Sequence, residues 1–485
     1  MIRLLSLTRI FGLMLTVFSV TYLLPILTSL AYEDGTATLF LMDMGLTLGA
    51  GLFLWGLTHR FQRELKARDG FILVVLAWLG MAAFATFPLM SHIVDLSFTD
   101  AYFEAISGLT TTGATVLTNL DYLPPAINLW RHELNWLGGM GIIVLAVAIL
   151  PILGVGGRQL YVAETPGPMK DSKLTPRITE TAKNLWLTYT LFTLACILSL
   201  KWAGMDWLDA ICHAFATMGL GGFSTHDASV GYFNSPEIEI VLIIFMLLAG
   251  MNFASHFLAL QQKSFSAYRQ DVEVMPYLLL MLGSCLGIGF YLWHAGVYED
   301  FFTSLRHASF NLVSIGTDCG FASTDFNEWP VFAPMWMLFL SSIAACTGST
   351  GGGIKMMRTL LLIKQSFMQM FLLAHPAAIK PLKLSDTVVS SDILLSVLGF
   401  IFAYFMTVVI LTLLLVISGL DFISSFTAII ASINNAGPGL GEVGPASNYA
   451  NLTDLQTWVC TLAMFLGRIE IFTALILFTP AFWQK

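Results

Sequence analysis

One short pattern occurs four times in this chain, each time between two long apolar segments. Each copy ends in a glycine, with a small residue twelve positions earlier and another six positions earlier. An internal repeat of this kind constrains the architecture before any local assignment, because the four units are expected to fold alike. The terminal glycines are Gly113, Gly222, Gly320 and Gly437, and the small residues are Ala101 and Ser107, Ala210 and Ala216, Ala308 and Ser314, and Ser425 and Ala431.

Each copy is too short and too polar to cross a bilayer, so we predict a half-helix that enters the membrane and returns as an extended segment. Irregular backbone at membrane depth is tolerated only inside protein or beside a watery cavity. Four such segments around one axis can direct carbonyl oxygens at a cation and replace its hydration shell. An ordinary loop hairpin, with glycine for turning, is the alternative for any single copy. The fourfold recurrence favours a selectivity filter.

The composition places the chain in a membrane. Hydrophobic residues make up 56% of it and charged residues only 11%, whereas soluble domains carry about 25% charged residues. The apolar run after Arg9 is long enough for a retained span rather than a cleaved signal peptide. The six cysteines show no C-x-x-C spacing, so neither a disulfide framework nor a zinc site is indicated.

We therefore predict an all-α polytopic membrane protein. Two N-terminal spans (10–30 and 36–58) precede four units, each a span, a re-entrant pore loop and a second span around a central pore, giving ten full crossings. The first spans are expected at 71–91, 184–203, 275–295 and 393–418, and the second spans at 132–153, 236–260, 331–363 and 455–481. The corresponding units are 1–70 for the N-terminal pair and 71–160, 161–262, 263–380 and 381–485 for the repeats.

The charge distribution supports this topology. With the N-terminus in the cytoplasm, most Lys and Arg residues fall in segments predicted to be cytoplasmic, including the C-terminus. Arginine and lysine concentrate on that side of membrane proteins. Most acidic residues fall on the opposite side, where they would concentrate cations at a pore mouth. A solvated surface that happens to be acidic is the alternative.

Each predicted second span carries a glycine motif, which would let the helix pack closely or bend. The third motif, TGSTGGGIK (347–355), differs in kind because its glycines cannot sustain a helix at bilayer depth. It does not match a phosphate-binding loop, since Ile354 separates Gly353 from Lys355. We predict a flexible gate beneath the filter, with a simple packing break as the alternative. The predicted gate residues are Thr347, Gly348, Ser349, Thr350, Gly351, Gly352, Gly353 and Lys355.

Arg468 is predicted to lie within the last span, with Glu470 two residues later. A charge inside a membrane is costly and is by default a candidate for function. It could pair with Glu470 or a neighbouring acid in a structural role. We favour a position beneath the filter, where it would hold the gate loop and repel cations.

With these motifs and the segments TTTGA, GGFST and CGFAST, the whole chain resembles the Trk/Ktr/HKT superfamily of potassium transporters, and within it the membrane subunits of bacterial Trk systems. The resemblance implies potassium as the bound ion, a homodimer with one pore per subunit, and a cytosolic ring of nucleotide-binding (NAD/ATP-type) regulatory subunits. It gives the filter as Thr110, Thr111, Thr112 and Gly113; Gly219, Leu220, Gly221 and Gly222; Thr317, Asp318, Cys319 and Gly320; and Asn434, Asn435, Ala436 and Gly437. The second segment also offers Gly219 and Gly221, and the fourth offers Gly439, as the key glycine.

The sequence thus predicts a potassium uptake protein of the bacterial inner membrane. It predicts neither an enzyme nor a nucleic-acid partner. Basic residues of 154–183 and 364–392 are assigned in part to docking the regulatory ring. The alternatives are a sodium-permeable or ion-coupled symporter, which usually carries carboxylates on broken helices at the midplane, and a non-transporting receptor or scaffold. His213, His256 and His307 are predicted to have packing or pore-helix roles.

Overall fold

The computed structural model describes residues 2–61, 66–141, 178–378, 381–384 and 387–484. Within these ranges almost all regular structure is helical. The two strands found there, β1 (Lys383–Leu384) and β2 (Thr387–Val388), form a short antiparallel ribbon. Six described helices are long and apolar enough to cross a membrane, or eight if each bent helix pair counts as one span. The predicted class, an all-α polytopic membrane protein, is confirmed.

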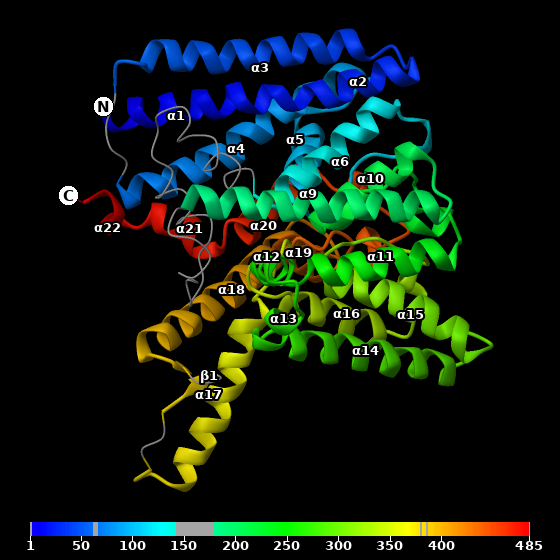
Figure 1. The fold of residues 1–485 in the computed structure, drawn as a ribbon, viewed down its shortest axis with the longest axis vertical. Coiled ribbons are helices and arrows are strands. Elements are labelled where there is room, and N and C mark those ends of the chain that lie inside the picture. Colours follow the sequence, from blue (N-terminus) through cyan, green and yellow to red (C-terminus); the bar gives the residue numbers. More distant parts are fainter. Residues whose placement is uncertain (1, 62–65, 142–177, 379–380, 385–386, 485) are drawn as a thin grey trace.

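The N-terminal spans form a layer along one edge of the molecule (Figure 1). α1 (Ile2–Phe18) continues through the 3₁₀ turn η1 (Ser19–Tyr22) into α2 (Leu23–Tyr32), and α3 (Ala37–Thr58) returns beside them. A Cβ atom at Gly12 would lie 2.8 Å from the carbonyl oxygen of Gly51, and the reverse distance is the same. Glycine therefore lets the two backbones approach closely, as in other membrane helix pairs.

Each of the four repeats begins with a long helix followed by a half-helix. The long helices are α4 (Ala67–His92), α9 (Ile178–Trp202), α14 (Val274–His294) and α18 (Ser391–Ile417). The half-helices are α5 (Phe98–Leu109), α10 (Trp207–Gly219), α15 (Phe301–Gly316) and α19 (Phe422–Asn434). Short 3₁₀ turns follow in the connecting loops: η2 (Leu120–Tyr122), η3 (Ser229–Tyr232), η4 (Phe326–Glu328), η5 (Gly441–Val443) and η6 (Tyr449–Asn451).

The second spans are broken rather than straight. Their described helices are α6 (Pro125–Gly139); α11 (Pro236–Ala249) and α12 (Phe253–Gln262); α16 (Phe332–Ile343) and α17 (Met356–Ala374); and α20 (Asp454–Arg468), α21 (Ile471–Leu475), η7 (Ile476–Phe478) and α22 (Pro480–Trp483). The chain bends by 96° between α11 and α12 and by 107° after α20. The predicted span 132–153 continues beyond the described residues from position 142. α13 (Ser266–Gln270) connects the second and third repeats.

These breaks occur at the glycine motifs. After α11 the chain turns at Gly250, and Asn252 caps α12 by accepting a hydrogen bond from the Ala254 N–H. The Cys346 N–H, from the loop between α16 and α17, donates to the Gly250 carbonyl at 3.0 Å. Tertiary hydrogen bonds therefore use the backbone groups that the break leaves without helical partners.

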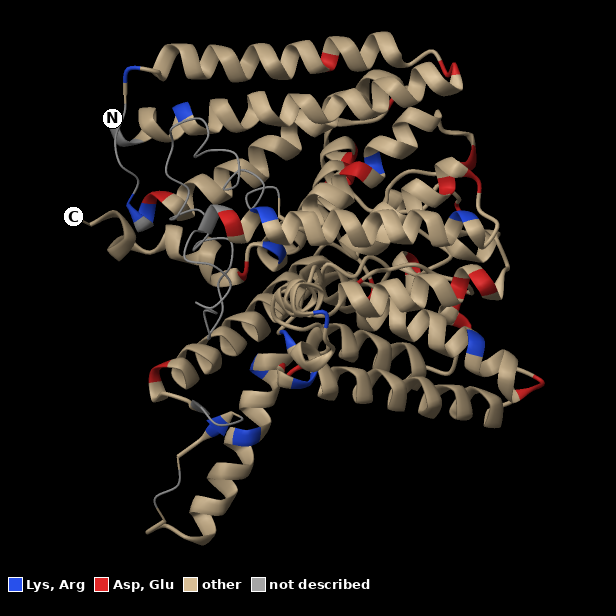
Figure 2. Cartoon of the chain, viewed as in Figure 1, with Lys and Arg blue, Asp and Glu red and all other residues tan. Residues whose placement is uncertain are grey.

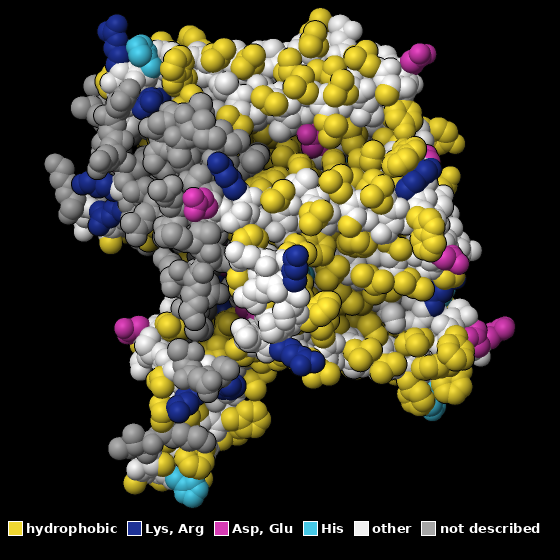
Figure 3. All heavy atoms as spheres, viewed as in Figure 1, with side chains coloured by type: hydrophobic (Ala, Val, Ile, Leu, Met, Phe, Trp, Pro, Cys, Tyr) yellow, Lys and Arg dark blue, Asp and Glu magenta, His cyan; other side chains and the backbone are white. Residues whose placement is uncertain are grey.

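The outer faces of the long helices suit contact with lipid. Figure 3 shows hydrophobic side chains spread over the described part of the visible face. Leu194 and Leu198 of α9 and Leu279 and Leu282 of α14 are exposed. In α3, only 22% of the most apolar 18-residue segment is buried inside the protein. Figure 2 shows acidic residues gathered toward one end of the helices and most basic residues toward the other. From the basic end, α17 projects away from the helical body as an arm (Figure 1).

Candidate ion pathway

The four half-helices begin at the acidic end and run into the protein. Each starts with a side-chain cap, which accepts a hydrogen bond from a backbone N–H of the first turn. The pairs are Ser97 with Asp100, Asp206 with Asp209, Asp300 with Thr303, and Asp421 with Ser424. Their C-terminal turns are buried. Because a helix C-terminus carries roughly half a negative charge, four such ends favour a cation in the protein interior.

The same backbone turn follows each half-helix. The second residue of each predicted filter segment has a left-handed conformation, with φ of 57° at Thr111, 53° at Leu220, 68° at Asp318 and 59° at Asn435. Two residues later the glycine is also left-handed, with φ of 77°, 61°, 96° and 85° at Gly113, Gly222, Gly320 and Gly437. These values place Gly222 and Gly437, rather than their neighbouring glycines, at the equivalent positions.

A shared backbone hydrogen bond involves the residue six positions before each glycine. Its carbonyl oxygen accepts from the N–H of the residue that precedes the glycine, and all four bonds measure 2.8 Å. The donors and acceptors are Thr112 and Ser107, Gly221 and Ala216, Cys319 and Ser314, and Ala436 and Ala431. The sequence spacing is therefore the spacing of one recurring turn that closes back onto its half-helix.

The four turns form a closed ring. A Cβ atom at Gly320 would lie 2.6 Å from the Ala436 carbonyl oxygen, and one at Gly437 would lie 2.7 Å from that of Thr112. A Cβ atom at Gly113 would collide with the Gly221 carbonyl, and one at Gly222 with that of Cys319. Each glycine thus faces the carbonyl group before the glycine of the next repeat. Any side chain at these positions would force the ring apart.

The ring opens into one cavity at the acidic end, which is lined by all four glycines and by Arg131, His226, Asp227 and Tyr449 among others. His226 contacts Asp121 at 2.5 Å and Asp209 at 3.3 Å, and its ring stacks on Tyr232 with centroids 3.5 Å apart. Burial lowers the pKa of His226, but hydrogen bonds to the two carboxylates outweigh burial and raise its pKa. The cluster joins the loops of the first two repeats.

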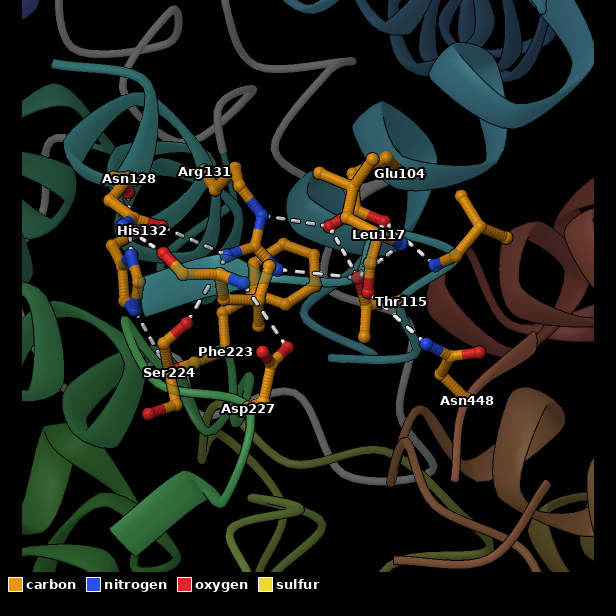
Figure 4. A network of polar contacts seen from close by, with 12 residues as sticks. Glu104, Thr115, Leu117, Asn128, Arg131, His132, Phe223, Ser224, Asp227 and Asn448 are labelled. Carbon is orange, nitrogen blue, oxygen red and sulfur yellow. Dashed lines mark hydrogen bonds and ion pairs between the residues drawn. The ribbon is translucent and has the colours of Figure 1, made fainter. Parts of the chain in front are cut away.

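A buried ion pair lies beside this cavity (Figure 4). Arg131 Nε on α6 donates to Glu104 Oε1 on α5 at 2.8 Å, and the two side chains are 1% and 0% exposed. Glu104 also accepts from the Thr115 hydroxyl and the Val116 N–H. Arg131 Nη1 donates to the Ser224 carbonyl at 3.2 Å. The network thereby ties the chain after the first predicted filter segment to the chain after the second.

The predicted gate residues form the irregular loop between α16 and α17. The Glu273 carboxylate accepts from the Thr347 N–H at 2.8 Å and from the Met357 N–H at 3.1 Å, so it holds both ends of this loop. The loop's middle reaches the second repeat, because the Thr350 hydroxyl donates to the Met218 carbonyl at 3.1 Å. The Gly352 N–H donates to Asp318 Oδ2, in the third predicted filter segment, at 2.9 Å. The loop therefore lies directly against the ring.

Arg468, at the end of α20, faces this loop. Its Nη1 donates to the Thr350 carbonyl at 2.9 Å and to the Thr111 hydroxyl at 3.2 Å, while Nη2 donates to the carbonyls of Gly138 and Gly139. It thus joins the loop, the first predicted filter segment and the end of α6. Glu470 instead binds Arg358 of α17 at 2.6 Å. Lys355 Nζ donates to the Gly351 carbonyl at 2.5 Å, within the loop itself.

In the first and fourth repeats, the glycine motif of the second span lets α6 and α20 approach the half-helices closely. A Cβ atom at Gly138 would collide with the Leu109 carbonyl at the end of α5, and one at Gly467 with the Ile433 carbonyl near the end of α19. α6 and α20 can therefore pack against the ends of the half-helices because glycine has no side chain at these two positions.

Two features of the site were not predicted from the sequence, namely the buried pair of Glu104 with Arg131 and the role of Glu273 at the gate loop. Glu104 and Arg131 lie 27 positions apart, and no local pattern links them. Glu273 lies at the end of a basic loop beside another acid, Asp271, so no sequence signal distinguishes it. The histidines fit the predicted packing roles: His213 contacts the Ser224 hydroxyl and His256 the Tyr268 hydroxyl. Among the described residues, no group of His, Cys, Asp and Glu is arranged to hold a metal ion.

Comparison with known proteins gives matches over nearly the whole chain. A family model described as TrkH, cation transport protein, matches residues 40–485. The Trk system potassium uptake protein TrkH of Salmonella typhimurium is 46% identical over 481 residues, covering 99% of both chains. TrkG of Escherichia coli K12, also named a Trk system potassium uptake protein, is 40% identical, covering 99% of this chain and 98% of its own. The crystal structure of the potassium transporter TrkH from Vibrio parahaemolyticus superposes with a TM-score of 0.89 at 42% identity, covering 99% of this chain and all of that one.

Proposed function

Because the chain belongs to the TrkH family of cation transport proteins, we propose that it carries potassium ions into the bacterial cell through a pore along the axis of its four repeats. The observation that supports this most is the ring of four equivalent turns, each preceded by a half-helix whose C-terminus points inward. The relatives are named for transport and not for a chemical reaction, so the chain is a transport protein rather than an enzyme.

In this proposal the filter consists of residues 110–113, 219–222, 317–320 and 434–437. Backbone carbonyl oxygens replace the water around a potassium ion, and the negative ends of the four half-helices lower the energy of the ion inside the protein. The acidic end faces outward and concentrates cations near the cavity. The membrane potential then drives inward flux, supplying about 2.3 kcal/mol per elementary charge at 100 mV.

The loop Thr347–Lys355 is the proposed gate. Its contacts with Arg468, Asp318 and Met218 hold it against the ring, and in this proposal its backbone lies across the path of the ion. Opening requires the loop to leave, so the closed and open arrangements must differ by only a few kcal/mol. Arg468 would hold the closed arrangement and add a positive charge that opposes cation entry.

The proposed regulator is a ring of cytosolic nucleotide-binding subunits, and the proposed assembly is a homodimer in the inner membrane with both termini in the cytoplasm. The basic end supports this orientation. The projecting arm carries Lys364 and the ribbon carries Lys383, which suit a regulatory surface. Exposed Phe367 and Met370 on the arm suit contact with a second copy. Residues 154–177 of the other basic segment lie outside the described residues.

Growth of a bacterial strain that lacks its own potassium uptake tests the proposal. Expression of the chain with its cytosolic partner should restore growth at low external potassium and accelerate uptake of a rubidium tracer. If uptake depends instead on an imposed proton or sodium gradient, the protein is an ion-coupled symporter. Membrane-inserted protein that restores neither growth nor tracer uptake would contradict the proposed function.

A further inference from the structure

The middle of the gate loop lies against oxygen atoms of the third and fourth filter segments. The Gly352 N–H donates to Asp318 Oδ2 at 2.9 Å. A Cβ atom at Gly352 would collide with the Asn434 carbonyl oxygen and would lie 3.3 Å from Asn435 Oδ1. A Cβ atom at Gly351 would lie 3.0 Å from the Thr317 carbonyl oxygen and 3.2 Å from Asp318 Oδ2. Two loop glycines therefore cover two backbone carbonyls and two side-chain oxygen groups.

Two side-chain oxygens of these filter residues lack a hydrogen-bond partner within the described residues. Asp318 is fully buried and Asn435 is 1% exposed, yet neither Asp318 Oδ1 nor Asn435 Oδ1 accepts a hydrogen bond within the described residues. The Asn435 amide is held in place, because its Nδ2 donates to the Thr112 hydroxyl at 2.9 Å and to the Met464 carbonyl at 3.0 Å. Buried polar atoms normally have partners, and an orphan pair calls for an explanation such as an ion.

Charge points to a cation as that partner. Asp318 is the only acidic residue in the four filter segments. While the loop is in place, its Gly352 N–H donates to Asp318 Oδ2. Lys355 belongs to the loop and is bonded to the Gly351 carbonyl, so movement of the loop would take this positive charge away. A buried carboxylate left without a counter-charge is strongly unfavourable.

We propose that Asp318, Asn435 Oδ1 and the carbonyls of Thr317 and Asn434 form a binding site for a dehydrated alkali cation, which the gate loop occupies when it closes. Carboxylate, amide and carbonyl oxygens are the ligands that hard cations prefer. In the closed state the Gly352 N–H takes the place of the ion at Asp318, and Lys355 adds a positive charge to the same loop. Binding of an ion and closure of the loop exclude each other, so a cation in this site keeps the gate open. This inference rests on the proposed transport function.

The test uses full-length protein in liposomes, with variants in which the gate loop cannot pack against the filter segments. In Gly352→Ala the added methyl group collides with the Asn434 carbonyl, so this variant should conduct without a partner. We expect the half-saturating potassium concentration for flux to rise at least tenfold in Gly352→Ala with Asp318→Asn, compared with Gly352→Ala alone. Gly352→Ala with Glu328→Gln is the matched control, because Glu328 is an exposed acid of an outer loop, and its half-saturating concentration should not change.

Binding to the purified variants gives a second readout that does not need conduction. Potassium chloride, compared with choline chloride, should raise the thermal stability of Gly352→Ala. The potassium concentration that gives half of this stabilisation should be at least tenfold higher when Asp318→Asn is added. An unchanged midpoint in flux, or in stability if Gly352→Ala does not conduct, overturns the inference. Absence of potassium flux from every variant and from the native protein with its partner would instead overturn the transport function.

Discussion

Removal of the Arg131 guanidinium should destabilise the protein strongly. Arg131→Met keeps most of the length and apolar volume of the side chain but removes its charge and its donors to Glu104, Ser224 and Asn128. Glu104 is fully buried and would remain as a carboxylate without its cationic partner. Its remaining donors are the Thr115 hydroxyl and the Val116 N–H, which do not neutralise it.

The magnitude follows from the burial of the pair. Removing one partner from a buried ion pair costs about 3–5 kcal/mol because the other charge stays desolvated. Loss of the contact between the guanidinium and the Phe223 ring, at 4.4 Å, adds about 1–2 kcal/mol. Replacing both charges removes the stranded carboxylate. Arg131→Met with Glu104→Gln should therefore cost at least about 2 kcal/mol less than the sum of the single variants.

The assay is equilibrium unfolding in mixed-detergent micelles, with the four proteins of this double-mutant cycle compared at one pH. Lys364→Met is the control. Lys364 is an exposed cation that donates only to a backbone carbonyl, that of Lys383 at 3.2 Å, so its loss leaves no buried carboxylate behind and should cost about 1 kcal/mol or less. Equal losses for Arg131→Met and Lys364→Met, or additive effects in the cycle, would refute the reasoning from burial.

Two further predictions concern the gate and the outer cavity. Arg468→Ala removes the donors to the Thr350 and Gly139 carbonyls, so potassium flux in liposomes without the partner should exceed that of the native protein, and flux at or below the native rate would remove Arg468 from the gate. His226→Gln tests the cluster with Asp121. Hydrogen bonds to the carboxylates raise the pKa of His226 above its ordinary value of 6.5. The stabilisation that protonated His226 gives the folded protein is therefore fully present below about pH 6.5 and is lost as the pH rises through the raised pKa. Unfolding measured across this range should show the native and variant stabilities converging at high pH, whereas a difference that grows with pH would contradict the assignment.

The repeated turns were predictable because their determinants are local. A small residue recurs six positions before each glycine, at the position whose carbonyl closes the turn, and the glycine supplies a left-handed conformation. Both features recur at fixed spacing, so four copies could be aligned from one sequence. The ambiguity at Gly222 and Gly437 needed the backbone, because neighbouring glycines satisfy the same sequence pattern.

The breaks and the buried pairs depend on contacts between distant segments. The glycine motif at 248–252 indicated that a helix could bend, but the 96° break depends on backbone partners from the loop after α16. Arg131 and Glu104 lie 27 positions apart, and nothing in the sequence identified them as partners. Glu470, a sequence neighbour of Arg468, instead binds Arg358 of the third repeat.

Potassium selectivity of the ring tests the central claim most directly. Purified native protein, Gly113→Ser and Gly296→Ser would be placed in liposomes and their potassium and sodium permeabilities measured separately, with the partner present. A side chain at Gly113 meets the Gly221 carbonyl, whereas Gly296 has a similar φ of 74° but no atom near its Cβ position. The native protein and Gly296→Ser should prefer potassium equally, and Gly113→Ser should lose much of that preference while remaining folded. A potassium-to-sodium permeability ratio in Gly113→Ser equal to that of the native protein would contradict the account.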